Sequence, residues 1–491
     1  MLLLGIDLGT SSVKVSVVDS QTQQVIASTQ YPEVEMGIES PQNGWAEQSP
    51  DTWWENVQTA ILKCHHTGLY NPSDITAIGI AYQMHGLVLV DKNQQVLYNS
   101  IIWCDSRAVQ IGEDAFNAIG HEKCLSHLLN SPGNFTAAKL AWIKQNEPAV
   151  YSKIDKVLLP GDFIAMKFTG ETTTTISALS EGIFWDFNTN TISADVINYF
   201  GFDQTLLPNI QPLFSTHGNI TKGVAEKLSL QQKVTITYKA GDQPNNALSL
   251  NVFEPGEVAA TAGTSGVIYG VSDQLKYDPQ SRVNSFAHVN YTAEVLRIGV
   301  LLCINGAGIF NRWTKDLLGN AHSYNELNAA AEKTAPGASG LFALPFGNGT
   351  ERMLGNKMVN SHFANINFNQ HSPAHMYRAV QEGVAFAMRY GLDIMRENGL
   401  QPTVVRAGQA NLFLSKVFSQ AFASVNNISI EYYDGDGSYG AAIGAGIGAG
   451  IFANTSTAFA NRKSTNIIEP KYISEYNDLY PQWKEQLEKH L

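Results

Sequence analysis

A short glycine-containing pattern occurs twice in this chain, and the two copies constrain its fold more than any other feature. Residues 7–19 read DLGTSSVKVSVVD and residues 261–273 read TAGTSGVIYGVSD, so six of thirteen aligned positions are identical without a gap. Each copy places Gly-Thr-Ser between two apolar segments, which is typical of a β-hairpin with a glycine turn. The repeat predicts two halves of similar build that each offer one such turn to a shared cleft. The alternative is a chance similarity of two hairpins, since Gly-Thr-Ser is common in turns.

The residue types in these turns suggest phosphate binding with a metal. Small residues after a strand let backbone N–H groups gather around a phosphate. Asp7 in the first copy is replaced by Thr261 in the second, so the turn itself does not require the carboxylate. We interpret Asp7 as a ligand of Mg²⁺, directly or through water, because Mg²⁺ binds through one or two carboxylates plus substrate phosphates. The candidate phosphate-binding residues are Gly9, Thr10, Ser11 and Lys14 in the first turn, and Gly263, Thr264 and Ser265 in the second. Lys14 fits a solvent-exposed strand position equally well.

Composition excludes several classes of partner. The 491 residues suggest two to four domains, and the net charge of −12 argues against a nucleic-acid partner. Four scattered cysteines without a Cys-x-x-Cys pair indicate reduced thiols and a cytoplasmic protein. The first residues become acidic too early for a signal peptide. The glycine-rich segment 439–453 is too short to span a membrane, so no membrane partner is expected.

Helix and strand patterns alternate along the chain, which favours the α/β class. Residues 2–8 and 13–18 are expected to form two strands of a hairpin. Ser49 and Pro50 predict the start of a helix, and a long helix is expected over 372–399. Asp242 follows a segment at 234–239 that is rich in strand-forming residues, and it precedes a helical pattern. It is therefore a candidate general base, or alternatively the N-cap of that helix.

An ordered set of motifs resembles the FGGY family of carbohydrate kinases, members of the actin and heat-shock-chaperone ATPase superfamily. Two of the matching motifs are the phosphate loops GIDLGTSSVKV and TAGTSGVIYG. The other matching motifs are GWAEQSPDTWWENV, GIAYQMHGLVLVD, IIWCDSRA, AGDQPNNALSLNVFEPGE and RAGQANLF. The resemblance implies an α/β fold with two ribonuclease-H-like domains flanking a central cleft. The expected domains are residues 1–245, which would bind the sugar and carry the first phosphate loop, and residues 246–491, which would bind the nucleotide.

The same resemblance implies transfer of the γ-phosphate of ATP to a sugar hydroxyl with Mg²⁺ as cofactor. The tetrapeptide QMHG at 83–86 is most similar to xylulokinases within the family, which implies D-xylulose as acceptor and D-xylulose 5-phosphate as product. Ribulose, gluconate or another polyol is the alternative acceptor. An actin- or chaperone-like ATPase and a catalytically silent sugar-binding regulator are alternatives of other classes. The resemblance also suggests a homodimer, and it implies a small-molecule sugar as the substrate.

The resemblance also assigns residues. It places Asp242 as the catalytic base and Asp7 at the metal. The expected sugar contacts are Gln83, Met84, His85, Trp103, Asp105, Asp242 and Gln243. His85 could instead be a structural histidine, while Trp103 and Asp105 could serve packing and an Asp105–Arg107 ion pair. The expected nucleotide contacts on the C-terminal side are Gly306, Asn311, Gly408, Gln409 and Asn411. Two departures stand out: only Gly408 remains where relatives have two or three glycines, and Gln243-Pro244 follows Asp242 where many have Asn-Ala.

Overall fold

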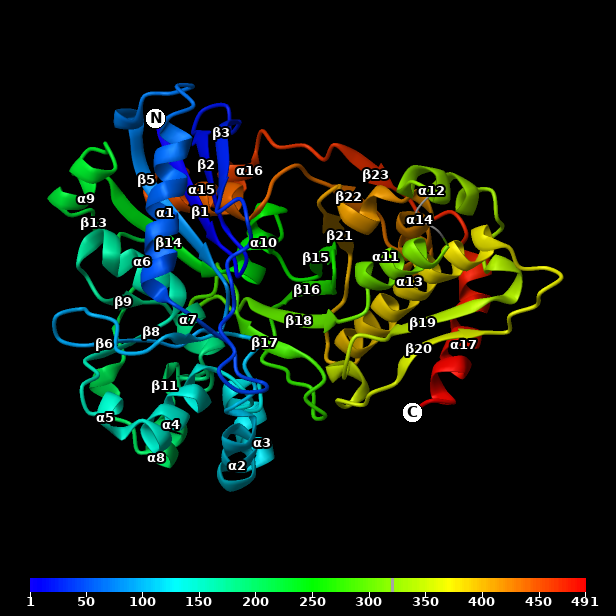
Figure 1. Cartoon of the computed structure of the whole chain (residues 1–491), viewed down its shortest axis with the longest axis horizontal. Coiled ribbons are helices and arrows are strands. Elements are labelled where there is room, and N and C mark those ends of the chain that lie inside the picture. The colour runs from blue at the N-terminus through cyan, green and yellow to red at the C-terminus, as the bar shows by residue number, and fades with distance from the viewer. Residues whose placement is uncertain (319–321) are drawn as a thin grey trace. The chain divides into compact units, whose positions relative to one another are not determined.

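Both predicted hairpins are present, and each lies within a separate sheet (Figure 1). The computed structural model describes residues 1–318 and 322–491, and these form two compact units. The first unit comprises residues 1–253, 286–298 and 435–462, and the second comprises 254–285, 299–434 and 463–491. The expected boundary between 245 and 246 would give 435–462 to the second domain, whereas this segment packs with the first unit. The α/β class with two units of similar build is confirmed.

The first unit contains a six-stranded sheet in the order β13-β14-β5-β1-β2-β3. Strands β1 and β2 are antiparallel, whereas β1, β5 and β14 are mutually parallel. The strands of this unit are β1 (Leu2–Leu8), β2 (Val13–Asp19), β3 (Val25–Tyr31), β4 (Glu47–Gln48), β5 (Ile75–Tyr82), β6 (Val88–Val90), β7 (Ser100–Ile101), β8 (Lys156–Leu158), β9 (Thr173–Thr174), β10 (Trp185–Asp186), β11 (Thr191–Ile192), β12 (Asn209–Ile210), β13 (Gly218–Asn219) and β14 (Thr235–Gly241). The carboxyl ends of the three parallel strands meet at one edge of the sheet.

Helices cover both faces of this sheet, with α1 (Pro50–His65) and α6 (Pro160–Thr169) on one face and α15 (Gly437–Gly448) on the other. The other helices of this unit are α2 (Val109–Ile119), α3 (His121–Leu128), α4 (Thr136–Asn146), α5 (Pro148–Tyr151), α7 (Ile176–Glu181), α8 (Ala194–Phe200), α9 (Lys222–Lys227), α10 (Asp242–Ser249) and α16 (Thr455–Phe459). Side chains alternate between faces along a strand. Leu4 and Ile6 accordingly join the core that includes Trp53 of α1, whereas Leu3 joins the core that includes Ala441 of α15. The predicted start of α1 is confirmed, because Ser49 caps it.

The glycine-rich segment forms the helix α15, and its composition has a packing cause. Gly5 and Gly79 on the sheet leave no room for a Cβ, because the backbone of α15 lies directly against them. On the helix side, Gly444 faces the ring of Tyr238 and Gly448 faces the backbone of Thr237 in the same way. Glycine on both partners therefore lets helix and sheet approach closely. Over residues 1–318 and 322–491, no helix is both long and apolar enough to cross a bilayer.

The second unit is built on a seven-stranded sheet in the order β17-β18-β16-β15-β21-β22-β23. Its strands are β15 (Glu257–Ala262), β16 (Gly266–Ser272), β17 (Asn284–Ala287), β18 (Ile298–Ile304), β21 (Val404–Ala407), β22 (Ile430–Tyr432) and β23 (Asn466–Ile468), with β19 (Phe342–Phe346) and β20 (Asn360–Ala364) as a separate pair. Its helices are α11 (Gly308–Leu317), α12 (Tyr324–Glu332), α13 (Pro373–Glu397), α14 (Lys416–Asn426) and α17 (Ile473–Glu488). Helix α13 confirms the long helix predicted over 372–399.

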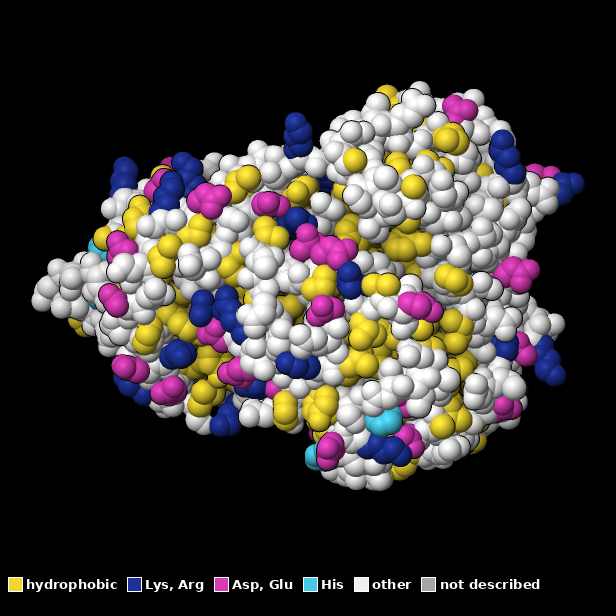
Figure 2. Space-filling model, turned by 180° about the vertical axis from the view of Figure 1, so that it is seen from behind, with side chains coloured by type: hydrophobic (Ala, Val, Ile, Leu, Met, Phe, Trp, Pro, Cys, Tyr) yellow, Lys and Arg dark blue, Asp and Glu magenta, His cyan; other side chains and the backbone are white. Residues whose placement is uncertain are grey.

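Figure 2 shows acidic and basic side chains interspersed on the face of the protein that it draws.

Candidate active site

In the first unit, parallel pairing brings three predicted residues to one sheet edge. Leu8 of β1 and Gly241 of β14 are both in register with Tyr82, the last residue of β5. Asp7, Gln83 and Asp242 therefore sit at neighbouring strand ends, although the last two lie 76 and 235 residues beyond Asp7 in the sequence. The Gln83 N–H also donates to the Leu8 carbonyl oxygen at 2.8 Å. Their meeting follows from strand order, which the local pattern around each residue does not reveal.

Negative charge accumulates at this edge. The pKa of Asp7 is raised to about 7, mainly by burial and then by the nearby carboxylates of Asp242 and Asp436, while Lys14 acts in the opposite direction. Burial raises the pKa of Asp242 to about 6, against hydrogen bonds from Gln243 that lower it. Asp242 is the first residue of α10, and Gly241 occupies the N-cap position. Asp242 is therefore not the N-cap residue of α10, which was the alternative interpretation.

A bound cation would relieve this repulsion. Within the described residues, no cluster of three or more His, Cys, Asp or Glu side chains has metal-binding geometry. A Mg²⁺ site needs no such cluster, because one or two carboxylates suffice when water and substrate phosphates complete the coordination shell. Asp7 and Asp242 offer this donor set. Lys14 lies 3.9 Å from Asp436 in a half-exposed ion pair, so its charge is partly neutralised there.

The first glycine turn is connected to the candidate sugar residues by hydrogen bonds. The Gly9 N–H donates to the Ser12 carbonyl oxygen at 3.0 Å, which closes the turn. The Thr10 hydroxyl donates to Gln83 Oε1 at 3.2 Å and accepts from Trp103 Nε1 at 2.9 Å. Gln48, which the sequence did not single out, donates to the Thr10 carbonyl oxygen and accepts from Gln83 Nε2. The turn, Gln83 and the half-exposed ring of Trp103 thus form one network.

His85 is held in an unusual backbone conformation, with φ of 63°. Its Nδ1 lies 3.0 Å from the Glu181 carbonyl oxygen, which can only accept, so Nδ1 carries the proton. Its backbone N–H donates to Glu181 Oε1, and its carbonyl oxygen accepts from Lys139 Nζ at 2.8 Å. The rings of Phe135 and Phe286 lie 4.8 and 5.3 Å from the imidazole ring. In the neutral ring, Nε2 is then the acceptor.

Four residues that contact His85 were not identified from the sequence, namely Lys139, Glu181, Phe135 and Phe286. Lys139 lies on α4 and is fully buried, and this burial lowers its pKa to about 7. Burial likewise raises the pKa of Glu181 well above its usual value. A lysine within a helical pattern normally reaches solvent, so its sequence gives no signal of this position. Phe286 belongs to the first unit, but in the sequence its segment lies between residues 254–285 and 299–434 of the second unit. The sequence therefore contains no sign that Phe286 lies beside His85.

Asp105 differs from its expected role as a sugar contact. Its side chain is buried and forms an ion pair with Arg107 at 2.7 Å, and Oδ2 also accepts from the Ala46 N–H. The Arg107 guanidinium is packed over the Trp45 ring at 3.7 Å and pairs with Glu47 as well. Both carboxylate oxygens of Asp105 are therefore engaged within the protein, as in the alternative that the sequence left open. Met84 is also buried. Its side chain packs against Gly241, so position 241 has no room for a Cβ.

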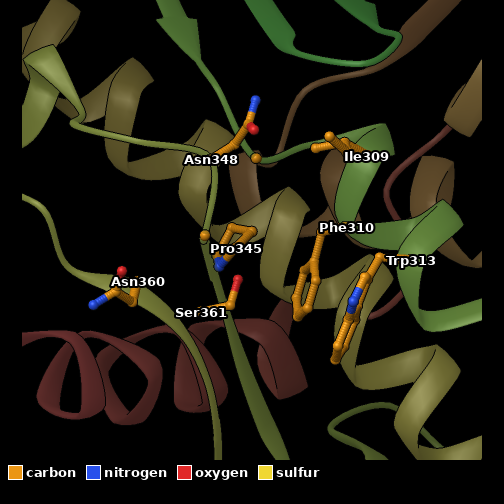
Figure 3. A pocket seen from close by; sticks show the side chains of 9 residues that line it. Ile309, Phe310, Trp313, Pro345, Asn348, Asn360 and Ser361 are labelled. Carbon is orange, nitrogen blue, oxygen red and sulfur yellow. The ribbon is translucent and has the colours of Figure 1, made fainter. Parts of the chain in front are cut away.

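The second unit contains a cavity of about 360 Å³ beside the second glycine turn. Four residues predicted to bind the nucleotide line it: Gly263, Thr264, Asn311 and Asn411. The remaining predicted residues on this side, Ser265, Gly306, Gly408 and Gln409, are not among its lining residues, and Gly306 lines a neighbouring cavity instead (Figure 3). The wall also includes polar residues that the sequence did not single out, namely Arg312, Tyr324, Asn325, Asn328, Gln381 and Ser415.

Hydrogen bonds order the floor of this cavity. Gln381 on α13 accepts from the Ser415 hydroxyl at 2.7 Å and donates to Asn328 Oδ1 at 2.8 Å. Asn311 Nδ2 donates to the Tyr377 hydroxyl at 3.0 Å. Asn411, one of the predicted nucleotide contacts, begins a short 3₁₀ helix, η5 (Asn411–Leu414). A polar, pre-formed cavity of this size beside a glycine turn can hold a nucleotide.

Comparisons with known proteins agree with this architecture. The N-terminal domain of the FGGY family of carbohydrate kinases matches residues 2–249, and its C-terminal domain matches residues 258–449. The xylulose kinase of Klebsiella pneumoniae is 29% identical over 90% of this chain and 88% of its own length. The structure of xylulose kinase from Rhodospirillum rubrum has a TM-score of 0.88 at 25% identity, covering 100% of this chain and 99% of that one. Gluconate kinase from Lactobacillus acidophilus has a TM-score of 0.89 at 22% identity, covering 99% and 98% of the two chains, which shows the shared fold alone. The chain belongs to the FGGY family of carbohydrate kinases.

Proposed function

We propose that this chain is an ATP-dependent xylulose kinase, which transfers the γ-phosphate of ATP to a hydroxyl of D-xylulose and releases D-xylulose 5-phosphate. Relatives that bear the name xylulose kinase cover most of the chain. The observation that carries the proposal is the common register of Leu8, Tyr82 and Gly241. This register supports the proposal, because Asp7, Gln83 and Asp242, the proposed metal ligand, sugar contact and base, lie at adjacent strand ends.

Asp242 is proposed as the general base. Its carboxylate would accept the proton of the attacking sugar hydroxyl as the oxygen forms its bond to phosphorus. With a pKa of about 6, the group is mainly ionised at neutral pH yet more basic than an ordinary aspartate. Its position at the N-terminus of α10, with hydrogen bonds from Gln243, fixes the direction of the carboxylate.

Asp7 is proposed to hold Mg²⁺. Asp242 lies close enough to Asp7 for their charges to interact, so a bound Mg²⁺ would also act on Asp242. When bound, the ion would supply positive charge that offsets the charge of the ATP phosphates. Gly9, Thr10 and Ser11 of the first turn are proposed to contact phosphate oxygens through backbone N–H groups and hydroxyls, with Lys14 contributing charge nearby. The close approach of Gly437 to Asp7 keeps the carboxylate in place.

Gln83, Met84, His85, Trp103 and Gln243 are proposed as the sugar-binding surface. His85 Nε2, as acceptor, can take a hydrogen bond from a sugar hydroxyl, while the indole of Trp103 can cover an apolar face of the sugar. Phe135 and Phe286 limit the space around the imidazole. Asp105 is left out of this surface, because its carboxylate is occupied by Arg107 and the Ala46 N–H.

The nucleotide is proposed to bind in the cavity of the second unit. Gly263, Thr264 and Ser265 would contact its phosphates, while Asn311 and Asn411 would contact the adenosine. The cavity wall does not include Ser265, Gly306, Gly408 and Gln409, and these four are proposed as contacts next to it. Cytoplasmic location and a homodimer stay predictions from the sequence.

A sugar-panel kinase assay tests the proposal. The purified chain would be given ATP, Mg²⁺ and one of D-xylulose, ribulose, gluconate or glycerol, and ADP release would be coupled to a recorded signal. We expect the highest kcat/KM with D-xylulose, and a loss of roughly 100-fold or more in kcat for Asp242→Asn with ATP binding retained. Preference for a non-ketose would refute the choice of sugar. ATP turnover that needs no sugar and survives Asp242→Asn would instead indicate an ATPase.

A further inference from the structure

Glu351 is a buried carboxylate in the second unit whose hydrogen-bond donors are backbone N–H groups. Its side chain has no exposed surface, and its two oxygens accept from the Asn305 N–H at 2.9 and 3.2 Å. The backbone of Gly306 also donates to it. Asn305 and Gly306 form the turn between β18 and α11. A buried carboxylate is costly unless it is well paired, so this arrangement calls for an explanation.

The segment 347–351, which ends at Glu351, forms further hydrogen bonds with this turn. Asn305 Nδ2 donates to the Thr350 carbonyl oxygen at 2.8 Å, and Asn348 Nδ2 donates to the Asn305 carbonyl oxygen at 3.2 Å. Gly306 has no room for a Cβ, because the carbonyl oxygen of Pro345 lies directly against it. Figure 3 shows Pro345 and Asn348 beside the start of α11, where Ile309 and Phe310 lie. The turn is thus fixed on one side by the chain that follows β19.

The other side of the same turn holds the second glycine loop. The Gly308 N–H donates to the Gly263 carbonyl oxygen at 2.8 Å, and the Ile309 N–H donates to the Thr264 carbonyl oxygen at 3.1 Å. Gly308 also lacks space for a Cβ, because Gly263 is packed against it. Gly263 and Thr264 line the cavity proposed for the nucleotide. A continuous set of backbone contacts therefore runs from Glu351 through residues 305–309 to the phosphate loop.

We infer that Glu351 is a positioning residue for the nucleotide: it fixes the 305–309 turn, and this turn fixes the phosphate loop at Gly263 and Thr264. The inference rests on the proposed function, because it takes the adjoining cavity as the ATP site. Glu351 itself lies outside the cavity wall, so it acts through the turn. Loss of its carboxylate would leave the backbone N–H groups of Asn305 and Gly306 without this acceptor, and the loop would then bind phosphate with less order.

The test compares Glu351→Ala and Glu351→Gln with wild type and with Glu485→Gln, a control at an exposed position on α17. ATP affinity would be measured by titration calorimetry, and KM for ATP and for the sugar by the coupled assay. We expect Glu351→Ala to raise KM and Kd for ATP about tenfold while KM for the sugar stays within about twofold. Glu351→Gln keeps one acceptor oxygen and should recover part of the affinity. The control should match wild type.

The outcomes separate the inference from the proposed function. If wild type binds ATP but both Glu351 variants bind it as tightly, the proposed function stands and the inference is overturned. If wild type does not bind ATP, the nucleotide site is wrong and the inference falls with it. Equal increases in KM for ATP and for the sugar would indicate general loosening and would also overturn it. If Glu351→Ala does not fold, Glu351→Gln decides the matter, because an unchanged Kd in that variant contradicts the inference.

Discussion

Lys139 donates a hydrogen bond from its buried Nζ to the carbonyl oxygen of His85 at 2.8 Å, across 54 positions of sequence. The same nitrogen donates to the Ile102 carbonyl oxygen at 3.0 Å, directly before Trp103. One lysine thus joins the two segments that carry His85 and Trp103. Its pKa is lowered to about 7 by burial, so the carbonyl groups are held by an ammonium group that loses its proton readily.

Replacing this lysine should weaken sugar binding selectively. Lys139→Met keeps the length and apolar stem of the side chain but removes both hydrogen bonds, which leaves the positive φ of His85 with less support. We expect KM for the sugar to rise about tenfold, with KM for ATP unchanged, in the coupled assay. Lys153→Met, at an exposed position of the same unit, is the control. An unchanged sugar KM in a folded Lys139→Met protein would contradict this role.

Gly437 should be essential for the geometry at Asp7. The Asp7 carboxylate lies against Gly437 at the start of α15, with no room for a Cβ. In Gly437→Ala, the carboxylate or the helix must move, and a displacement of about 1 Å in such a site can reduce activity roughly 100-fold. We expect this loss in kcat, together with a higher Mg²⁺ concentration for half-maximal activity.

The matched control is Gly223→Ala on α9, since no atom lies near its Cβ position. Thermal unfolding of both variants separates a local effect from lost stability. If Gly437→Ala retains wild-type kcat and the same Mg²⁺ dependence, the close packing at Asp7 has no catalytic consequence.

Asp105→Asn should act on stability more than on sugar recognition. Removing one partner of a buried ion pair costs about 3 kcal/mol, because the buried Arg107 would lose the charge of Asp105 and keep only its pair with Glu47. We expect the free energy of unfolding in urea to fall by about this amount, whereas Asp74→Asn at an exposed position should leave it unchanged. A variant of normal stability with a large increase in sugar KM would restore Asp105 as a sugar contact.

The hairpins, the helix starts at Ser49 and Ser372, and the placement of Asp7 near the end of one strand and of Asp242 after another could all be predicted, because each depends on local pattern. What could not be predicted depends on which strands and helices become neighbours. Asp105 and Arg107 already suggested an ion pair, but their burial under Trp45 required the tertiary structure.

The segment 435–462 shows the same limit in another form. Its glycine-rich part, residues 439–453, is apolar like a membrane segment but too short to be one, and its glycines are explained by the close packing of α15 on Gly5 and Gly79. Lys139 on α4 looked like an ordinary surface lysine for a similar reason. A residue chosen for a contact distant in sequence carries no local sign of it.

The activity of the protein should have an acidic limb set by Asp242. A general base works only when ionised, and this carboxyl has a pKa of about 6, above that of an ordinary aspartate. As the pH falls through this value the protonated fraction rises, so kcat/KM should decline about tenfold for each further pH unit. Above about pH 7 the group is ionised and the profile should be flat on this side. Rates would be measured between about pH 5 and pH 8 at saturating Mg²⁺, because a bound cation keeps Asp7 ionised and leaves Asp242 as the group that titrates. Incubation at each pH followed by return to pH 7.5 shows that the protein has not unfolded. The residual rate of Asp242→Asn should lack this limb, because the titrating group is gone. A wild-type profile that is flat down to pH 5, or an identical limb in the asparagine variant, would mean that another group takes the proton.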